Sequence, residues 1–245
     1  MSLSLVVHGP EGEQFSTYTT QRWPYGTQLV MQDGRKWRFA GAPTLLVTGN
    51  VIQAAASVGN DVNRAGIAAA VGSKAPTLTL GGATTANLYA EGYWQNSVTP
   101  GGGESYKINN HLGGQTAVVF NLDAGLVTAI TTTTRVDLIK NPYDAVIQLP
   151  ITTHTGSVVG VAASAIPASG FGWIQTAGMA SVLTDASVVT VLGKAVCASV
   201  VTAGTCTHYI PTEAGPPTGL DRPIIGHCQR TAAVSAWADV RLILD

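Results

Sequence analysis

The stretch Thr116-Ala-Val-Val-Phe-Asn-Leu122 alternates between residues that suit a core and residues that suit a surface. Successive side chains of a β-strand point to opposite faces, so Val118, Phe120 and Leu122 would share one face. Residues 74–80, KAPTLTL, show the same period, with their two leucines on one face. Both stretches predict strands that are buried on one side only.

The rest of the chain extends this β pattern. Thr, Val, Ile and aromatic residues supply many apolar and semi-polar positions, whereas Glu and Lys, which usually fill exposed helix faces, are scarce. We therefore predict an all-β protein built of sandwich or barrel units. Residues 54–71 contain alanine runs interrupted by glycine, and a short helix and an irregular loop are equal alternatives there. Turn signals recur at short intervals, at residues 33–34, 81–82, 100–103, 113–114, 141–142 and 215–217.

These cues divide the chain into three expected parts. Residues 1–48 carry aromatic and polar residues with few continuous apolar runs, and we expect an extended N-terminal arm there. Residues 49–150 hold the helix candidate and the alternating strands, and we expect them to form a β domain. Residues 151–245, rich in Gly and Ala, are expected to form a C-terminal β domain.

The composition points to a protein that associates with others. Only 11% of residues are charged, 45% are hydrophobic, and the formal net charge is −1. A nearly neutral surface lacks the repulsion that keeps soluble proteins apart, so we expect partners to cover part of it. Because 13 basic residues are offset by 14 acidic ones, nucleic acid is not an expected partner.

The chain carries no signal for a membrane or for export. Its first ten residues, MSLSLVVHGP, lack a basic segment, and their apolar run is too short for a signal peptide. Every longer apolar stretch is interrupted before it reaches the length of a membrane helix. We expect synthesis in the cytoplasm and no membrane partner.

The cysteines and histidines of the C-terminal third are the best candidates for metal ligands. Cys197, Cys206, His208, His227 and Cys228 lie within a short span, but no C-x-x-C pair is present. An odd number of cysteines in a chain without an export signal also argues against a disulfide framework. We expect buried thiols, no metal and no cofactor.

No pattern indicates a catalytic residue, so we expect no enzymatic activity. The chain has no G-x-S-x-G elbow, and Cys228 follows an apolar run, which favours a buried thiol over a nucleophile. The loop Pro100-Gly-Gly-Gly-Glu104 lacks the lysine of a phosphate-binding loop. A carbohydrate-active enzyme with a pair of carboxylates is the alternative from another class, although no spacing favours it.

The N-terminal region holds the residues that we expect to bind a partner. Stretches 21–26 and 34–39 combine Trp, Tyr and Arg, the residue types that dominate binding hot spots, although capping a barrel is an equal alternative for them. The apolar anchors would be aromatic and the flanking contacts basic. The predicted contact residues are Arg22, Trp23, Tyr25, Arg35, Trp37, Arg38 and Phe39.

Several short motifs resemble those of tailed-phage virion proteins that decorate, or cement, the capsid. They are residues 25–39 (YGTQLVMQDGRKWRF), 87–93 (NLYAEGY) with 106–108 (YKI), 141–143 (NPY) and 171–178 (FGWIQTAG). The closing stretches 223–232 and 240–244 are similar to the last strands of small phage decoration domains.

The resemblance implies a β-rich homotrimer on the outer surface of an icosahedral shell, with the N-terminal arm contacting the shell or a neighbour. Its partners would be copies of itself and the major capsid protein, its location the virion, and its effect a stabilised shell. The alternative is a head-fibre, tail or adaptor component of the virion, whose neutral β-rich composition would be the same.

Overall fold

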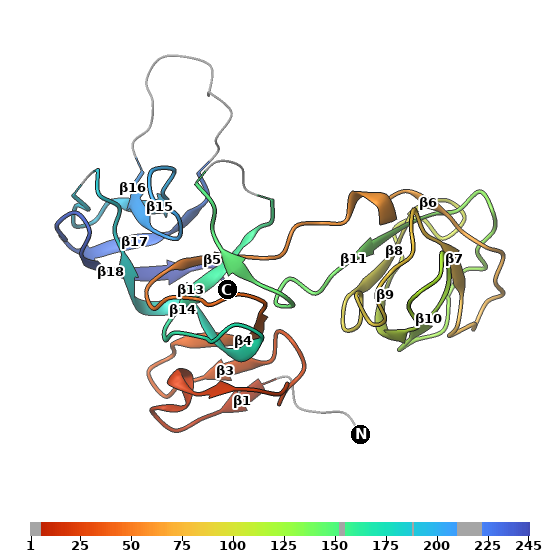
Figure 1. The fold of residues 1–245 in the computed structure, drawn as a ribbon, viewed down its shortest axis with the longest axis horizontal. Helices are drawn as coiled ribbons and strands as arrows, with labels where there is room; N and C mark the ends of the chain where they lie inside the picture. Colours follow the sequence, from red (N-terminus) through yellow and green to blue (C-terminus); the bar gives the residue numbers. More distant parts are fainter. Residues whose placement is uncertain (1–5, 152–154, 188, 210–221) are drawn as a thin grey trace, which may run out of the picture. The chain divides into compact units, whose positions relative to one another are not determined.

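The computed structural model describes residues 6–151, 155–187, 189–209 and 222–245. Regular structure in these ranges consists of strands and two single-turn 3-10 helices (Figure 1). The prediction of an all-β fold is therefore confirmed.

The chain forms two compact units, and one is inserted into the other. Unit 1 consists of residues 1–55 and 142–245, and unit 2 of residues 56–141. This division differs from the expected three parts. The middle part begins and ends inside the expected 49–150, and the two outer parts belong to a single unit because their strands pair with each other.

Unit 1 is built on one large, mostly antiparallel sheet. Along its main path the strand order is β1-β3-β4-β14-β18-β17-β15-β16, and β2, β5, β12 and β13 pair beside that path. The elements are β1 (Val6–His8), η1 (Glu13–Phe15), β2 (Thr17–Tyr18), β3 (Gln28–Val30), β4 (Lys36–Ala42), β5 (Val51–Gln53), β12 (Ile147–Gln148), β13 (Val158–Ala162), β14 (Gly170–Leu183), β15 (Ala195–Ala198), β16 (Cys206–His208), β17 (Ile224–Arg230) and β18 (Trp237–Ile243).

The long strand β14 organises this sheet. Its first half pairs with β4 and β13, and its second half pairs with β18. The strand bends between these halves, where the register with β4 shifts between Gln175 and Ala177. Gly178 follows with a φ of +86°, a conformation that residues with a Cβ rarely adopt. The bend lets one strand serve two parts of the sheet.

Residues 6–48 are not an extended arm, and this part of the sequence prediction is wrong. Strand β4 lies inside the sheet, between β3 and β14, and its register pairs Trp37 with Gln175 and Phe39 with Trp173. Trp37 and Phe39 are buried in a core cluster with Leu29, Met31 and Trp173. The reason is the long-range pairing with β14, which gives these aromatic side chains a core that their own segment lacks.

Unit 2 is a smaller sheet that nearly closes into a barrel. Its strand order is β6-β11-β8-β9-β10-β7, and an isolated bridge between Gly66 and Leu78 joins the two ends of that order. Figure 1 shows these strands wrapped into one group. The elements are η2 (Gly59–Asp61), β6 (Arg64–Ala65), β7 (Thr77–Thr79), β8 (Tyr93–Val98), β9 (Ser105–His111), β10 (Ala117–Leu122) and β11 (Arg135–Ile139).

The strand pattern predicted for unit 2 is confirmed. In β10 the side chains of Val118, Phe120 and Leu122 are buried and those between them are exposed. They belong to a core cluster that also contains Tyr89 and Trp94. The helix option for residues 54–71 is wrong, because this segment holds only the turn η2 and the short strand β6 among loops.

Because unit 2 has its own core and a continuous chain, we expect the isolated fragment 56–141 to fold alone. A cooperative unfolding transition, with coincident midpoints from circular dichroism and Trp94 fluorescence, would confirm it. The matched fragment 49–150, cut at the borders expected from sequence, should have the same midpoint because its extra residues belong to unit 1. A higher midpoint for 49–150 would show that unit 2 extends beyond residues 56 and 141.

Candidate binding site

The structure gathers the predicted aromatic residues into the core of unit 1. The Phe39 ring lies 5.2 Å from the ring of Trp173 and 5.3 Å from that of Trp23, both edge-on. It also stacks at 6.1 Å on Phe171. Edge-to-face and offset aromatic pairs of this kind stabilise a core beyond the area that they bury. Phe39 is therefore a core residue, and so is Trp37.

Three of the predicted contact residues lie where a partner can reach them. Arg22 is exposed, and its guanidinium carbon lies 4.9 Å from the Trp23 ring and 5.3 Å from the Tyr18 ring. Trp23 and Tyr25 are half-buried. These three residues lie in the loop between β2 and β3, and this loop is the part of the expected partner-binding segment that remains accessible.

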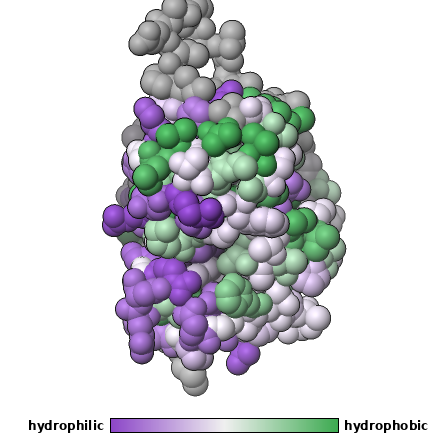
Figure 2. Space-filling view, turned by 90° about the vertical axis from the view of Figure 1, so that its left-hand side faces the viewer, coloured by the Kyte–Doolittle hydropathy of each residue, from purple (hydrophilic) through white to green (hydrophobic). Residues whose placement is uncertain are grey.

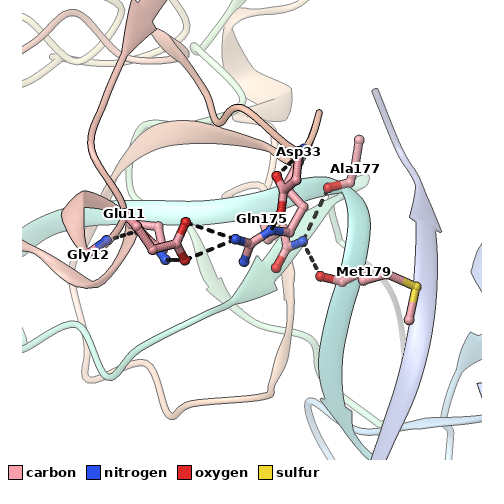
Figure 3. A network of polar contacts seen from close by, with 8 residues as sticks. Glu11, Gly12, Asp33, Gln175, Ala177 and Met179 are labelled. Atoms are coloured by element: carbon pink, nitrogen blue, oxygen red, sulfur yellow. Dashed lines mark hydrogen bonds and ion pairs between the residues drawn. The ribbon is translucent and has the colours of Figure 1, made fainter.

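Arg35 links the loop before η1 to the loop before β4 through Glu11 and Asp33, both labelled in Figure 3. Its Nη2 donates to both carboxylate oxygens of Glu11, at 2.9 and 3.0 Å, and its Nε donates to Asp33. The guanidinium also lies 5.1 Å from the Trp37 ring. The buried Gln14 completes the network by donating from Nε2 to Glu11 at 2.7 Å. Arg35 is thus occupied by contacts within the chain.

Arg38 is likewise engaged, by the C-terminal residue. Its Nε and Nη2 donate to the two carboxylate oxygens of Asp245, both at 2.8 Å, and its Nη1 donates to the carbonyl of Gly26. The hydrogen bonds from Arg38 lower the pKa of the Asp245 carboxyl. A bidentate pair of this geometry fastens the end of β18 to β4.

A pocket that the sequence did not predict lies at the bend of β14. We call it the β14 pocket; its volume is about 190 Å³. Large exposed apolar side chains lie at its mouth, and the sheet forms its walls. Its lining consists of Gln14, Phe15, Arg35, Trp37, Thr48, Val161, Ala163, Gln175, Met179, Ala180, Ser181 and Trp237.

Two of the residues that line the pocket, Trp37 and Gln175, carry buried N–H groups. Trp37 is only 1% exposed, and its indole Nε1 has no hydrogen-bond partner within the described part of the chain. Gln175 donates from Nε2 to the carbonyls of Met179, at 2.8 Å, and Ala177, at 3.2 Å, across the bend (Figure 3). A buried N–H without a partner costs free energy, so the position of the Trp37 ring in the core is maintained against that cost.

A wider, charged groove of about 960 Å³ adjoins the β14 pocket and shares Arg35 and Met179 with it. Its other lining residues include Asp33, His227, Arg241 and Asp245. His227 and Arg241 are opposite each other on β17 and β18, and both are exposed. Neither side chain hydrogen-bonds or ion-pairs with the residues that the structure describes. The two acids of the groove are already paired to arginines.

Sequence reasoning missed the mouth of the pocket, formed by Phe15, Met179 and Trp237. For Trp237 a signal was present, since β18 alternates and its buried positions Ala238 and Val240 place Trp237 on the exposed face. Phe15 lies on the one-turn helix η1, and Met179 lies beside the bend of β14. Neither place has a regular alternation of buried and exposed positions from which exposure could be predicted. Their exposure is a result of the tertiary structure alone.

The surface of unit 1 also carries apolar side chains outside the pocket. Figure 2 shows green, hydrophobic patches directly beside purple, hydrophilic ones on this face. Exposed large apolar residues occur in the loop before β15 and in the turn between β17 and β18. They are Val189, Val191, Leu192 and Val234. Exposed apolar side chains that gather into a patch often mark a contact with a partner.

The three cysteines are buried free thiols, which agrees with their interpretation from sequence. Burial raises the pKa of the Cys206 thiol to about 12 and also raises that of Cys197. Cys228 is buried while its neighbour His227 is exposed, because successive side chains of β17 point to opposite faces. Nowhere in the described ranges do three or more His, Cys, Asp or Glu residues group as metal ligands.

Unit 2 has a buried polar cluster of its own. The Tyr89 hydroxyl donates to the Asp61 carboxylate, and the pKa of Tyr89 is raised by burial and by this hydrogen bond. The backbone N–H of Tyr89 donates to Nε2 of His111 at 3.0 Å. Nδ1 of His111 lies 2.8 Å from the carbonyl of Leu112 and donates to it, which fixes a neutral tautomer. The side chains of Asp61, Tyr89 and His111 are buried, so the cluster supports the fold.

The fold and the site together describe an all-β protein of two units with an apolar pocket and a charged groove on one of them. Comparison with protein families, with curated proteins and with solved structures finds no match to this chain. No helix within the described residues is long and apolar enough to cross a membrane.

Proposed function

We propose that the chain is a non-enzymatic structural protein that decorates the outer surface of a tailed-phage capsid as a homotrimer and stabilises the shell. Its partners are copies of itself and the major capsid protein, and its location is the surface of the virion. The capsid as the partner rests on the sequence motifs that resemble decoration proteins.

The observation that carries an assembly role is the exposure of large apolar side chains on both units. Exposed examples are Leu45 and Trp237 in unit 1 and Leu112 and Val127 in unit 2. Charged residues, at 11% of the chain, are too few to surround so much apolar surface. Association with partners removes this surface from water, at roughly 25 cal/mol per Å² before the ordering costs.

The burial of Trp37 and Phe39 changes which residues can contact the capsid. Deleting residues 1–48 would remove strand β4 from the middle of the sheet. Such a deletion would disrupt the fold of unit 1, so a loss of capsid binding would not show that these residues touch the capsid. The exposed loop with Arg22, Trp23 and Tyr25 is the part of the predicted set that remains for this role.

The test uses capsids purified without this component and the full-length protein. We expect the protein to bind in trimers, to co-sediment with capsids and to raise the temperature at which they open. Arg22→Glu should lower occupancy at least tenfold, because it reverses the charge of the exposed loop. Lys194→Glu, an equal charge reversal elsewhere on unit 1, should have no such effect.

Three outcomes would contradict the proposal or a part of it. Binding to purified tails or fibres without binding to capsids would assign the chain to another part of the virion. A monomer in solution that neither binds capsids nor protects them from heat would reject a decoration role altogether. Hydrolysis in a screen of glycans would contradict the non-enzymatic part.

A further inference from the structure

Two loops of unit 2 meet beside a pair of exposed apolar side chains. The N–H of Gly72 donates to the carbonyl of Leu126 at 2.8 Å, and the N–H of Leu126 donates to the carbonyl of Ser73 at 3.0 Å. These bonds hold the neighbouring residues Val71 and Val127 together at the loop ends. Val127 is 73% exposed, more than any other large apolar residue of the described chain, and Val71 is 64% exposed. We call this pair the tip.

The tip is flanked by one charge of each sign. Asp123 and Lys74 are exposed, and they are neighbours because the N–H of Leu122 donates to the carbonyl of Lys74 at 2.8 Å. Neither side chain forms an ion pair with any residue that the structure describes. The tip therefore presents apolar side chains and two available charges to a partner.

The β14 pocket and its groove offer the complementary features. The pocket, at about 190 Å³, has room for one or two aliphatic side chains and is smaller than the pockets that hold drug-sized ligands. Its mouth is apolar, because Phe15, Met179 and Trp237 line it and are each about half-exposed. In the groove, His227 and Arg241 can pair with an acidic side chain of a partner. Asp33 is paired with Arg35, but its side chain is 52% exposed and can receive a second cation.

We infer that the tip of one copy of this chain docks into the β14 pocket of the next copy. Val127 enters the pocket, Asp123 meets Arg241 and His227, and Lys74 meets Asp33. This contact joins two different surfaces of the chain, so each copy can bind the next one in the same way. If the rotation from one copy to the next is one third of a turn, three copies form a closed ring. It rests on the proposed homotrimer, in which it forms the centre of the subunit interface.

Light scattering coupled to size exclusion, over a range of concentrations, tests the tip and the pocket separately. Val127→Asp and Trp237→Ala should each raise the concentration for half-assembly at least tenfold. The matched controls are Leu112→Asp, equally exposed at 69% on unit 2, and Leu192→Ala on unit 1, and each should change it less than twofold. Thermal melts of all four variants should show the unfolding transition of the wild type, which establishes that they fold.

Disulfide cross-linking then identifies the contact itself. The native thiols are buried, so oxidation reports on introduced cysteines. The double variant Val127→Cys with Ser181→Cys, at the pocket wall, should give covalent dimers and trimers under mild oxidation. Each single variant alone should give none, because the contact joins two different surfaces.

Three results would overturn the inference. A wild-type trimer whose assembly all four substitutions leave unchanged would place the interface elsewhere and leave the homotrimer standing. Cross-linked dimers from a single variant would indicate a two-fold contact between like surfaces. A double variant that forms its disulfide only within a monomer would show that the tip fills the pocket of its own chain.

Discussion

Phe39→Ala is expected to lower the free energy of unfolding of unit 1 by about 3–5 kcal/mol, the usual cost of removing a buried aromatic side chain from a core. Phe39 is 0% exposed and is surrounded by Trp23, Phe171 and Trp173. Whole domains are stable by only about 5–15 kcal/mol, so this loss takes a large share of the total. Denaturant unfolding, followed by the near-ultraviolet circular dichroism of the aromatic cluster, measures it.

Phe15→Ala is the matched control for this prediction. It is the same chemical change on a side chain that is 56% exposed, and we expect an effect within about 0.5 kcal/mol. Comparing the two variants also shows whether residues 6–48 belong to the core of unit 1 or form an arm. If residues 6–48 were an arm held only by a partner, the two substitutions would change the stability of the free protein equally little.

Acidification is expected to destabilise unit 2 through His111, the only histidine among residues 56–141. Burial lowers the pKa of His111 below its ordinary value of 6.5. Protonation would put a hydrogen on Nε2, where the N–H of Tyr89 already donates, and the two donors would oppose each other. The folded state thus resists a proton that the unfolded state accepts.

The direction of the pH dependence follows from this difference. Below pH 6.5 the unfolded chain binds a proton that the folded unit does not, so stability falls as the pH falls, until the lowered pKa of the folded state is reached. The slope should approach about 1.4 kcal/mol per pH unit, the value for one proton. Stability above pH 7 should be level.

Denaturant unfolding of fragment 56–141 between pH 7.5 and 5.5 measures this slope, since its carboxylates ordinarily titrate below this window. His111→Gln is the control, because an amide can accept from Tyr89 and donate to Leu112 but cannot titrate here. We expect the variant to be less stable at pH 7.5 and to lack the slope. An equal slope in both proteins would assign the effect to another group.

The fold of unit 2 shows what local sequence can determine. The alternation of Val118, Phe120 and Leu122 depends only on the two-residue period of a strand, and the structure has it in β10. The glycine-rich turns and the scarcity of Glu and Lys likewise carried the all-β prediction. These signals work because each reflects the conformation of a few neighbouring residues.

The same alternation is present in Lys36-Trp-Arg-Phe39, yet it did not reveal where the strand lies. Whether Trp37 and Phe39 form an exposed arm or a core depends on β14, whose residues follow more than a hundred positions later. The inserted unit 2 separates the two partners along the chain. A strand is specified locally, but its neighbours in a sheet are not.

The candidate site depends wholly on which strands become neighbours in the sheet, which the local sequence does not specify. The mouth of the β14 pocket combines Phe15, Met179 and Trp237, and its wall adds Trp37 and Gln175 from β4 and β14. No local pattern links these positions, since each comes from a different element or from a different part of β14. The sequence by itself determined that this chain would form strands with apolar faces. Only the tertiary structure decided which apolar side chains remained exposed, because burial is settled by which strands pair and how β14 bends.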